Sequence, residues 1–340
     1  MPLYPLLLAP IYKEKVWGGR GLEEFGRFLP GGSEAMIGES WELADLSVTN
    51  PSGGGGGAAR SLIRNGPLSK RTLGDVIRDF GPLVTGTMKL SPDGSFPLLL
   101  KYLDARENLS VQVHPSEAYA AEHPDVHIKS EAWYVVATEP GAKIYRGLVA
   151  GVDRELFQVA AQDGSLETLL RSEPVEPGQC IYLPSGTVHA LGGGVLVAEV
   201  QTASDTTFRI FDWGRTGREL HIQEALACID FTGKEPETVD FEDVAADDGD
   251  WAMRPLVSCE HFQMNEWTAL GIVPHAFVSD ELSVLMVVSG SAIITWGEGE
   301  GRTLMVGTGD TVVLPAGLAS AEVHAKLDLT LLEIAPPRTN

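Results

Sequence analysis

A repeated turn motif is the sequence feature that most constrains the fold of this chain. The motif reads Gly, five residues, Pro, one residue, Gly, two residues and a key position, and it occurs at Gly178, Pro184, Gly186 and His189 and again at Gly309, Pro315, Gly317 and Ser320. The four residues before each proline are apolar or β-forming, so each copy predicts a strand that enters a tight turn. The duplication therefore predicts two similar β units.

The rest of the chain also predicts a mainly β protein. Its 38 glycines and 21 prolines separate short apolar runs, a pattern typical of sandwiches and barrels. The expected strands are 96–103, 110–114, 131–138, 143–148, 179–183, 195–201, 207–212, 283–289, 291–296, 311–314 and 330–334. Fewer helices are expected, at 73–80, 116–122, 153–162, 165–170 and 222–229.

The repeated motif resembles the second sequence motif of the cupin superfamily, in which the key residue is a metal-binding histidine. This resemblance implies two cupin (jelly-roll) barrels with a few peripheral helices. The key residue is His189 in the first copy and Ser320 in the second. Because a serine alone is a poor ligand for a transition metal, we expect a metal site in the N-terminal barrel only and a structural role for the C-terminal barrel.

Charge divides the chain into segments. Lysine and arginine number 25 against 47 aspartates and glutamates, and the net charge of −22 disfavours nucleic-acid and anionic membrane partners. Nine acidic residues and one lysine lie between Asp230 and Asp250, which is typical of a solvated linker. We expect a catalytic cupin domain over 1–232, an acidic linker over 233–250 and a degenerate cupin domain over 251–340. The glycine run 53–57 predicts a flexible surface loop.

Two further features favour a cytoplasmic protein. The three cysteines, Cys180, Cys228 and Cys259, are widely spaced and odd in number, so we expect free thiols in a reducing compartment. No run of 18 apolar residues is present, and the proline-broken segment 1–8 lacks the basic region and cleavage site of a signal peptide. A monomer and a homodimer are both compatible with the sequence.

Two histidines and one carboxylate form the candidate metal site. His114 and Gln112 share one face of an expected strand, and Lys129 and Glu131 share a face where the next strand begins. Together with His189, His114 and Glu131 make a ligand set that leaves an open coordination position, with Gln112 as the candidate fourth ligand. Zinc is the first expectation because imidazole and carboxylate suit it, although iron and manganese would accept the same set.

Several motifs resemble the type I mannose-6-phosphate isomerases, specifically their shorter bacterial form. These motifs are Lys15–Gly19, Ile37–Glu42, Phe96–Lys101, Leu109–Pro115, Lys129–Tyr134, Pro184–Leu191, Ser204–Arg209 and Asp212–Trp213. The resemblance extends over residues 8–232 and is weak beyond them. It implies a zinc-dependent aldose–ketose isomerase, with one zinc ion per chain, that interconverts mannose 6-phosphate and fructose 6-phosphate through an enediol.

The resemblance also implies roles for individual residues. It places the metal ligands at His114, Glu131 and His189, the active-site arginine at Arg209 and the substrate-phosphate contacts at Ser110 and Lys129. For Arg209, an ion pair with Asp205 or Asp212 is the structural alternative. The general base stays open among Glu199, Gln201, Asp205 and a metal-bound water.

Two other functions are compatible with these residues. A non-catalytic, metal-containing sugar-binding cupin would keep the fold without turnover. A cupin oxygenase would need redox-active iron.

Overall fold

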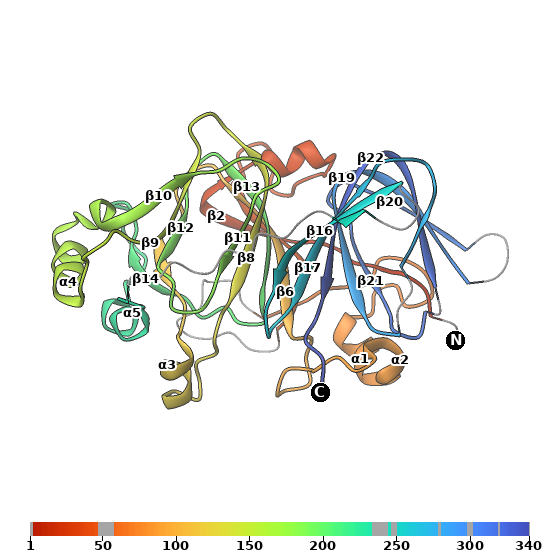
Figure 1. Ribbon diagram of the computed structural model, residues 1–340, viewed down its shortest axis with the longest axis horizontal. Helices are drawn as coiled ribbons and strands as arrows, with labels where there is room; N and C mark the ends of the chain where they lie inside the picture. The colour runs from red at the N-terminus through yellow and green to blue at the C-terminus, as the bar shows by residue number, and fades with distance from the viewer. Residues whose placement is uncertain are drawn as a thin grey trace.

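The computed structural model describes residues 3–46, 58–232, 244–245, 250–277, 280–297, 302–318 and 320–339. Two groups of strands lie side by side, and most of the helices lie outside them (Figure 1). The mainly β class expected from the sequence is confirmed. The glycine run 53–57 and most of the acidic segment 233–250 lie outside the described residues.

Two sheets carry most of the N-terminal half, which we define as residues 8–232. The first has the strand order β11-β8-β13-β6-β2-β3, with β11 Cys180–Leu183, β8 Glu131–Thr138, β13 Val195–Thr202, β6 Leu98–Ala105, β2 Ile11–Gly19 and β3 Ile37–Leu43. The second has the order β10-β9-β12-β7-β14, with β10 Leu170–Pro174, β9 Lys143–Leu148, β12 His189–Leu191, β7 Val111–Val113 and β14 Phe208–Phe211. A small ribbon pairs β4 (Asp45–Leu46) with β5 (Ala59–Arg60).

One nine-stranded sheet forms the C-terminal half, which we define as residues 250–339. Its order is β1-β21-β19-β22-β17-β16-β15, with β18 paired to β22 and β20 paired to β19. The strands are β1 Leu6–Leu7, β21 Thr311–Leu314, β19 Ser283–Trp296, β22 Ala321–Ala335, β17 Gln263–Ala269, β16 Trp251–Ser258, β15 Val244–Ala245, β18 His275–Phe277 and β20 Thr303–Gly307. Strand β1 comes from the N-terminus of the chain, so the two halves share a sheet.

The sequence repeat extends to strand order and register. The order β11-β8-β13-β6 in the N-terminal half matches β21-β19-β22-β17 in the C-terminal half. Leu183 pairs with Glu131 in the first sheet, as Leu314 pairs with Ser283 in the second. Likewise, Lys101 pairs with Glu199 in β6 and β13, and in the same register the pair in β17 and β22 is Asn265 with Glu333. The paired positions named here therefore have structural counterparts in the two sheets.

The helices begin and end at the residues that local chemistry favours. They are α1 Leu73–Phe80, α2 Pro82–Thr85, α3 Glu117–Glu122, α4 Arg154–Asp163 and α5 Ile222–Cys228, with 3₁₀ turns η1 Gly21–Phe25 and η2 Leu166–Leu169. The Thr72 side chain accepts a hydrogen bond from the Asp75 amide at the start of α1, and Asp153 does the same for Leu156 at α4. Gly164 ends α4 in the left-handed region, with φ 83°.

Two arginine contacts fasten the halves to each other in a reciprocal way. The repeat glycines Gly178 and Gly309 have φ angles of 88° and 86°, in the left-handed region. The Arg254 guanidinium of β16 donates to the Gly178 carbonyl at 2.7 Å, and Arg27 of the N-terminal half donates to the Gly309 carbonyl. Each arginine is also paired with a glutamate of its own half, so each repeat turn is held by a charged group from the other half.

The expected elements differ from the structure in a few places. Segments 283–289 and 291–296 form the single strand β19 rather than two, because the chain passes through Gly290 without leaving the sheet. Residues 166–169 form a 3₁₀ turn rather than an α-helix, and β22 begins at Ala321 rather than at residue 330. The strands that were not expected from the sequence are β1, β2, β3, β4, β5, β10, β12, β15, β16, β17, β18 and β20. No helix within the described residues is long and apolar enough to cross a membrane.

Candidate metal centre

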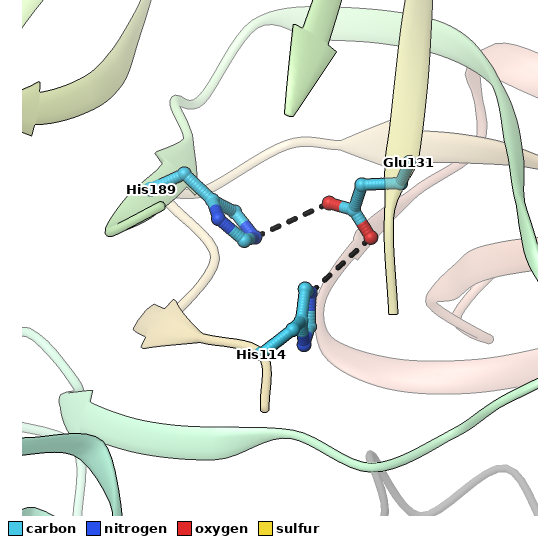
Figure 2. Close-up of side chains that lie close together, drawn as sticks. All are labelled: His114, Glu131 and His189. Carbon is cyan, nitrogen blue, oxygen red and sulfur yellow. Dashed lines mark ion pairs between the residues drawn. The ribbon is translucent and has the colours of Figure 1, made fainter. Parts of the chain in front are cut away.

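Three buried side chains converge at one end of the N-terminal strands. His114 directly follows β7, Glu131 is the first residue of β8 and His189 is the first residue of β12. Their exposed fractions are 2%, 0% and 1%. His114 Nε2 lies 3.2 Å from Glu131 Oε2, and His189 Nε2 lies 3.2 Å from Glu131 Oε1 (Figure 2). Within the described part of the chain, this is the one group of three His, Cys, Asp or Glu side chains whose ligand atoms lie within 4.8 Å of one another.

Backbone carbonyls fix the orientation of both imidazoles. His114 Nδ1 lies 3.0 Å from the Thr206 carbonyl oxygen, and His189 Nδ1 lies 2.9 Å from that of Thr187. Because a carbonyl only accepts, each Nδ1 carries the proton and each Nε2 presents a lone pair. Histidine ligands of metals commonly donate their second N–H to a carbonyl in this way.

The electrostatics of the trio fit a cation. Burial, helped by the charge of Lys129, lowers the pKa of His114 to about 3, so its imidazole is neutral. Burial would raise the pKa of Glu131, but the charge of Lys129, helped by the contacts with the two histidines, outweighs it and holds that pKa well below the usual range. Neither carboxylate oxygen accepts a hydrogen bond of good geometry from the described residues. Two imidazole lone pairs and an ionised carboxylate thus meet without a proton between them, an arrangement that a metal ion stabilises.

The repeat turn holds these donors in place. Gly186, at φ +87°, lets the chain reverse where a Cβ would lie 3.0 Å from the Cys228 carbonyl oxygen. The Gly186 amide donates to the His114 carbonyl at 3.1 Å, and Ser185 Oγ accepts from the Lys129 amide at 3.1 Å. One turn therefore connects the chain around His114, the start of β8 and the strand that carries His189.

Gln112 and Lys129 complete the surroundings of the trio. Gln112 Nε2 lies 3.2 Å from His189 Nε2, so the side-chain amide lies beside the trio. The Lys129 ammonium lies 2.9 Å from Glu131 Oε2 and 3.2 Å from His114 Nε2. Lys129 is 4% exposed and belongs to the interior rather than to a solvated surface.

A polar cleft adjoins the trio. The residues predicted to act on a substrate, Ser110, Lys129 and Arg209, all line it together with Gln112. Its other charged lining residues are Lys15, Glu39, Lys101, Glu199, Asp205 and Arg218. Five basic side chains therefore face three acidic ones, in a chain whose net charge is −22. This local excess of positive charge favours an anionic ligand.

Arg209 projects into this cleft from β14. Its neighbours Phe208 and Ile210 are 2% and 0% exposed and pack into the core behind the strand. Arg209 Nε donates to Ser110 Oγ at 3.3 Å, and Nη1 donates to the Glu219 carbonyl at 2.9 Å. Burial, reinforced by the charge of Arg218, lowers the pKa of Arg209, although a guanidinium stays charged at neutral pH.

Asp212, one of the two alternative partners considered for Arg209, is engaged by two other arginines. Arg215 Nη2 donates to Asp212 at 2.9 Å, and Arg218 Nε donates to it at 2.7 Å. The Arg209 guanidinium is instead held by neutral oxygens of Ser110 and Glu219.

Sequence reasoning missed a buried charge network on the cleft floor. Lys101 Nζ donates to Glu199 Oε1 at 3.0 Å and to Gln201 Oε1 at 2.6 Å, and Trp133 Nε1 donates to Glu199 Oε2 at 3.0 Å. Lys101 stands within the apolar run 98–103, and a lysine in such a run is the signal that could have revealed the network. Glu199, a candidate base, thus has both oxygens engaged.

Comparisons with known proteins identify the family of this chain. The catalytic domain of type I phosphomannose isomerase matches residues 6–141. The mannose-6-phosphate isomerase ManA of Bacillus subtilis (strain 168) is 33% identical, over 95% of this chain and 97% of its own. A crystal structure of the Bacillus subtilis mannose 6-phosphate isomerase covers 98% of this chain and 99% of its own, at 29% identity and a TM-score of 0.84. A zinc-bound mannose 6-phosphate isomerase shares the fold at 17% identity and a TM-score of 0.73, over 98% of this chain and 100% of its own. The chain belongs to the type I mannose-6-phosphate isomerase family.

Proposed function

We propose that this protein is a zinc-dependent aldose–ketose isomerase that interconverts mannose 6-phosphate and fructose 6-phosphate. The observation that carries the proposal is the convergence of two imidazole lone pairs and a buried carboxylate beside a cleft with excess positive charge. Membership of the family and the names of its relatives supply the substrate. The isomerase function expected from the sequence is supported over a sugar-binding cupin without turnover.

His114, Glu131 and His189 are proposed to hold the zinc ion, with Gln112 as a fourth ligand. Neutral imidazole and carboxylate suit zinc, and the zinc-bound relative has the same fold. When bound, such an ion acts as a Lewis acid that polarises the sugar oxygens. The counterparts of Glu131 and His189 in the C-terminal half are Ser283 and Ser320. We therefore propose one zinc ion per chain, in the N-terminal half.

The phosphate of the substrate is proposed to meet Ser110 and Lys129. Ser110 Oγ lies at the cleft wall and already accepts from Arg209. The Lys129 ammonium lies between the Glu131 carboxylate and the cleft, so it can exchange one anionic partner for another. A lysine serves such a phosphate as a point charge.

Isomerisation moves a proton between C2 and C1 of the open-chain sugar through an enediol. Arg209 is proposed to stabilise the negative charge that develops on the enediol oxygens, because its guanidinium is always charged and projects into the cleft. The contacts to Ser110 and the Glu219 carbonyl hold the guanidinium in place before substrate arrives. Asp205 and Glu199, two of the three carboxylates that line the cleft, are proposed as candidates to accept the proton.

The proposed organisation is a catalytic cupin barrel over 1–232, a linker over 233–250 and a second barrel over 251–340. The matching strand order and register of the two halves support a duplicated barrel. The cysteines Cys180, Cys228 and Cys259 are all free thiols, which supports a reducing compartment such as the cytoplasm. The proposed partner is the sugar phosphate itself.

A coupled assay of fructose 6-phosphate formation tests the function. The protein is stripped of metal with a chelator and assayed before and after addition of zinc. We expect turnover only with zinc. Arg209→Ala should lose nearly all turnover while retaining zinc, whereas Arg106→Ala, at an exposed arginine outside the cleft lining, should behave as the native protein does. A folded, zinc-loaded protein without turnover would refute the proposal.

A further inference from the structure

Two of the sequence motifs, Lys15–Gly19 and Ile37–Glu42, form one wall of the cleft. They lie in the neighbouring strands β2 and β3, which pair with each other. The side chains that they contribute to the lining are Lys15, Trp17, Glu39 and Trp41. This wall therefore contains an ammonium group and a carboxylate that belong to neither the metal trio nor the Arg209 side of the cleft.

A bulge in β2 turns Lys15 toward the cleft. Residues 15–18 leave the ladder between β2 and β3, because the residues on either side of them both pair with Ile37. Lys15 and Trp17 line the cleft, whereas Val16 between them is 62% exposed. Bulges are common beside active sites, where they re-aim a side chain in this way.

Two glycines allow the bulge to pack closely on β3. A Cβ on Gly18 would lie 2.4 Å from the Gly38 amide nitrogen, and a Cβ on Gly38 would lie 2.6 Å from the Cβ of Lys15. A larger residue at either position would push the bulge away from β3. The absence of side chains at these two positions thus fixes the backbone that carries Lys15.

Glu39 sets the direction of the Lys15 side chain. Lys15 Nζ lies 3.0 Å from Glu39 Oε1, and Trp41 Nε1 donates to Glu39 Oε2 at 2.6 Å. The Lys15 and Glu39 side chains are 13% and 12% exposed, so the ion pair lies in the cleft wall rather than on the outer surface. Because an ammonium group has three donors, Lys15 can contact Glu39 and a ligand in the cleft at the same time.

The strand register places this ion pair away from the metal centre. Glu131 lies in the same cross-strand row as Leu99 of β6, through Gln201 of the intervening strand β13. Glu39 lies in the row of Leu103, four residues further along β6, which is about 13 Å along the strand. A sugar whose first two carbons lie at the metal centre therefore extends its phosphate end toward this wall.

We propose that Lys15, held by Glu39, is a further contact of the substrate phosphate and makes the cleft specific for a phosphorylated sugar. Lys129 lies 2.9 Å from Glu131 Oε2, at the metal end of the cleft, so Lys15 is the cation that meets the phosphate from the far side. The proposal rests on the isomerase function and adds to it a residue that selects the phosphate. Glu39 is a positioning residue, because it acts through Lys15.

Binding of glucitol 6-phosphate to the full-length, zinc-loaded protein, measured by calorimetry, tests this role. The hexitol has no carbonyl group and cannot be isomerised, so failure of the phosphate contact and failure of the isomerase function give different results. Lys15→Met removes the charge, Lys15→Arg keeps it, and Lys13→Met is the matched control in the same strand, outside the cleft lining. Circular dichroism and metal analysis check that each variant is folded and loaded with zinc.

We expect Lys15→Met to weaken binding about 10- to 100-fold, because a charge-assisted contact to the phosphate is lost. The same variant should raise KM for mannose 6-phosphate and leave kcat nearly unchanged, as loss of uniform binding does. Lys15→Arg should retain most of the affinity, and Lys13→Met should bind as the native protein does. Unchanged binding in Lys15→Met, or equal losses in Lys15→Met and Lys13→Met, would overturn the proposal.

The double variant Lys15→Met with Glu39→Gln distinguishes a phosphate contact from a purely structural role. If Lys15 contacts the phosphate, the double variant binds glucitol 6-phosphate as weakly as Lys15→Met alone. If Lys15 only neutralises Glu39, removal of both charges restores the affinity, and that result would overturn the proposal.

Discussion

The arginine contacts between the halves allow a quantitative test of how burial sets the contribution of an ion pair to the free energy of unfolding. Arg27 donates to both oxygens of Glu42, with Nη1–Oε1 at 2.7 Å and Nη2–Oε2 at 2.9 Å, and their side chains are 11% and 2% exposed. Arg254 donates to Glu266 at 2.9 Å, but these side chains are 34% and 14% exposed. Both arginines also donate to a repeat glycine of the other half, so the two sites differ chiefly in their access to water.

Replacement of each arginine by methionine separates the two cases. Arg27→Met leaves the Glu42 carboxylate buried, with a hydrogen bond from Ser40 Oγ at 2.6 Å. Removal of one partner of a buried ion pair lowers the free energy of unfolding by about 3–5 kcal/mol. Arg254→Met leaves Glu266 within reach of water, so we expect its free energy of unfolding to fall by about 1 kcal/mol. Because neither arginine lines the cleft, isomerase turnover at 25 °C should be unchanged in both variants.

Urea unfolding followed by tryptophan fluorescence measures these losses. The double variant Arg27→Met with Glu42→Gln is the internal control, since it removes the unpaired charge and should recover part of the stability lost in Arg27→Met alone. Equal losses for Arg27→Met and Arg254→Met, or a double variant less stable than Arg27→Met, would refute the reasoning that a stranded buried charge dominates the cost.

Three further predictions concern the catalytic half. Glu131→Gln should lower zinc affinity at least about 100-fold and abolish turnover, because a neutral amide replaces the ionised ligand; competition with a chelator measures this, and full zinc occupancy would contradict it. Arg209→Lys should retain zinc but lose about 100- to 1000-fold in kcat, since a point charge cannot reproduce the forked contacts; steady-state kinetics with metal analysis decide this. Burial would raise the pKa of Glu39, but Lys15 and Lys101 outweigh it and hold that pKa at about 2. A carboxylate whose pKa is depressed by folding stabilises the folded state at pH values above its pKa in the unfolded chain. At such pH the native protein should exceed Glu39→Gln in free energy of unfolding by about 3 kcal/mol, and this difference should fall as the pH drops from about 4.5 towards 2. Urea midpoints across that range test it, and a constant difference would contradict it.

Local patterns in the sequence were sufficient for much of the fold. The strands 131–138, 143–148 and 311–314 and the helix 73–80 have the bounds expected from alternation, turn residues and capping. Strand β16 was missed because Pro255 interrupts its pattern. Strands β2 and β3 were missed because polar side chains such as Lys13 and Glu39 are spread along them. Their place in the sheet depends on partners far away in the chain, which no local window contains.

The sequence by itself identified the candidate metal ligands that meet in the structure: the turn motif marked His189, and alternation placed His114 beside Gln112 and Glu131 beside Lys129. Only the tertiary structure decided how those groups are oriented and which groups they contact. The Thr206 carbonyl that orients His114 lies 92 residues away from it, and the Lys101–Glu199 pair joins strands 98 residues apart. Strand β1 crosses to the sheet of the other half. Periodicity specifies which face of a strand a side chain occupies, whereas the pairing of strands, the desolvation of charges and the direction of a lone pair arise only when distant segments pack together.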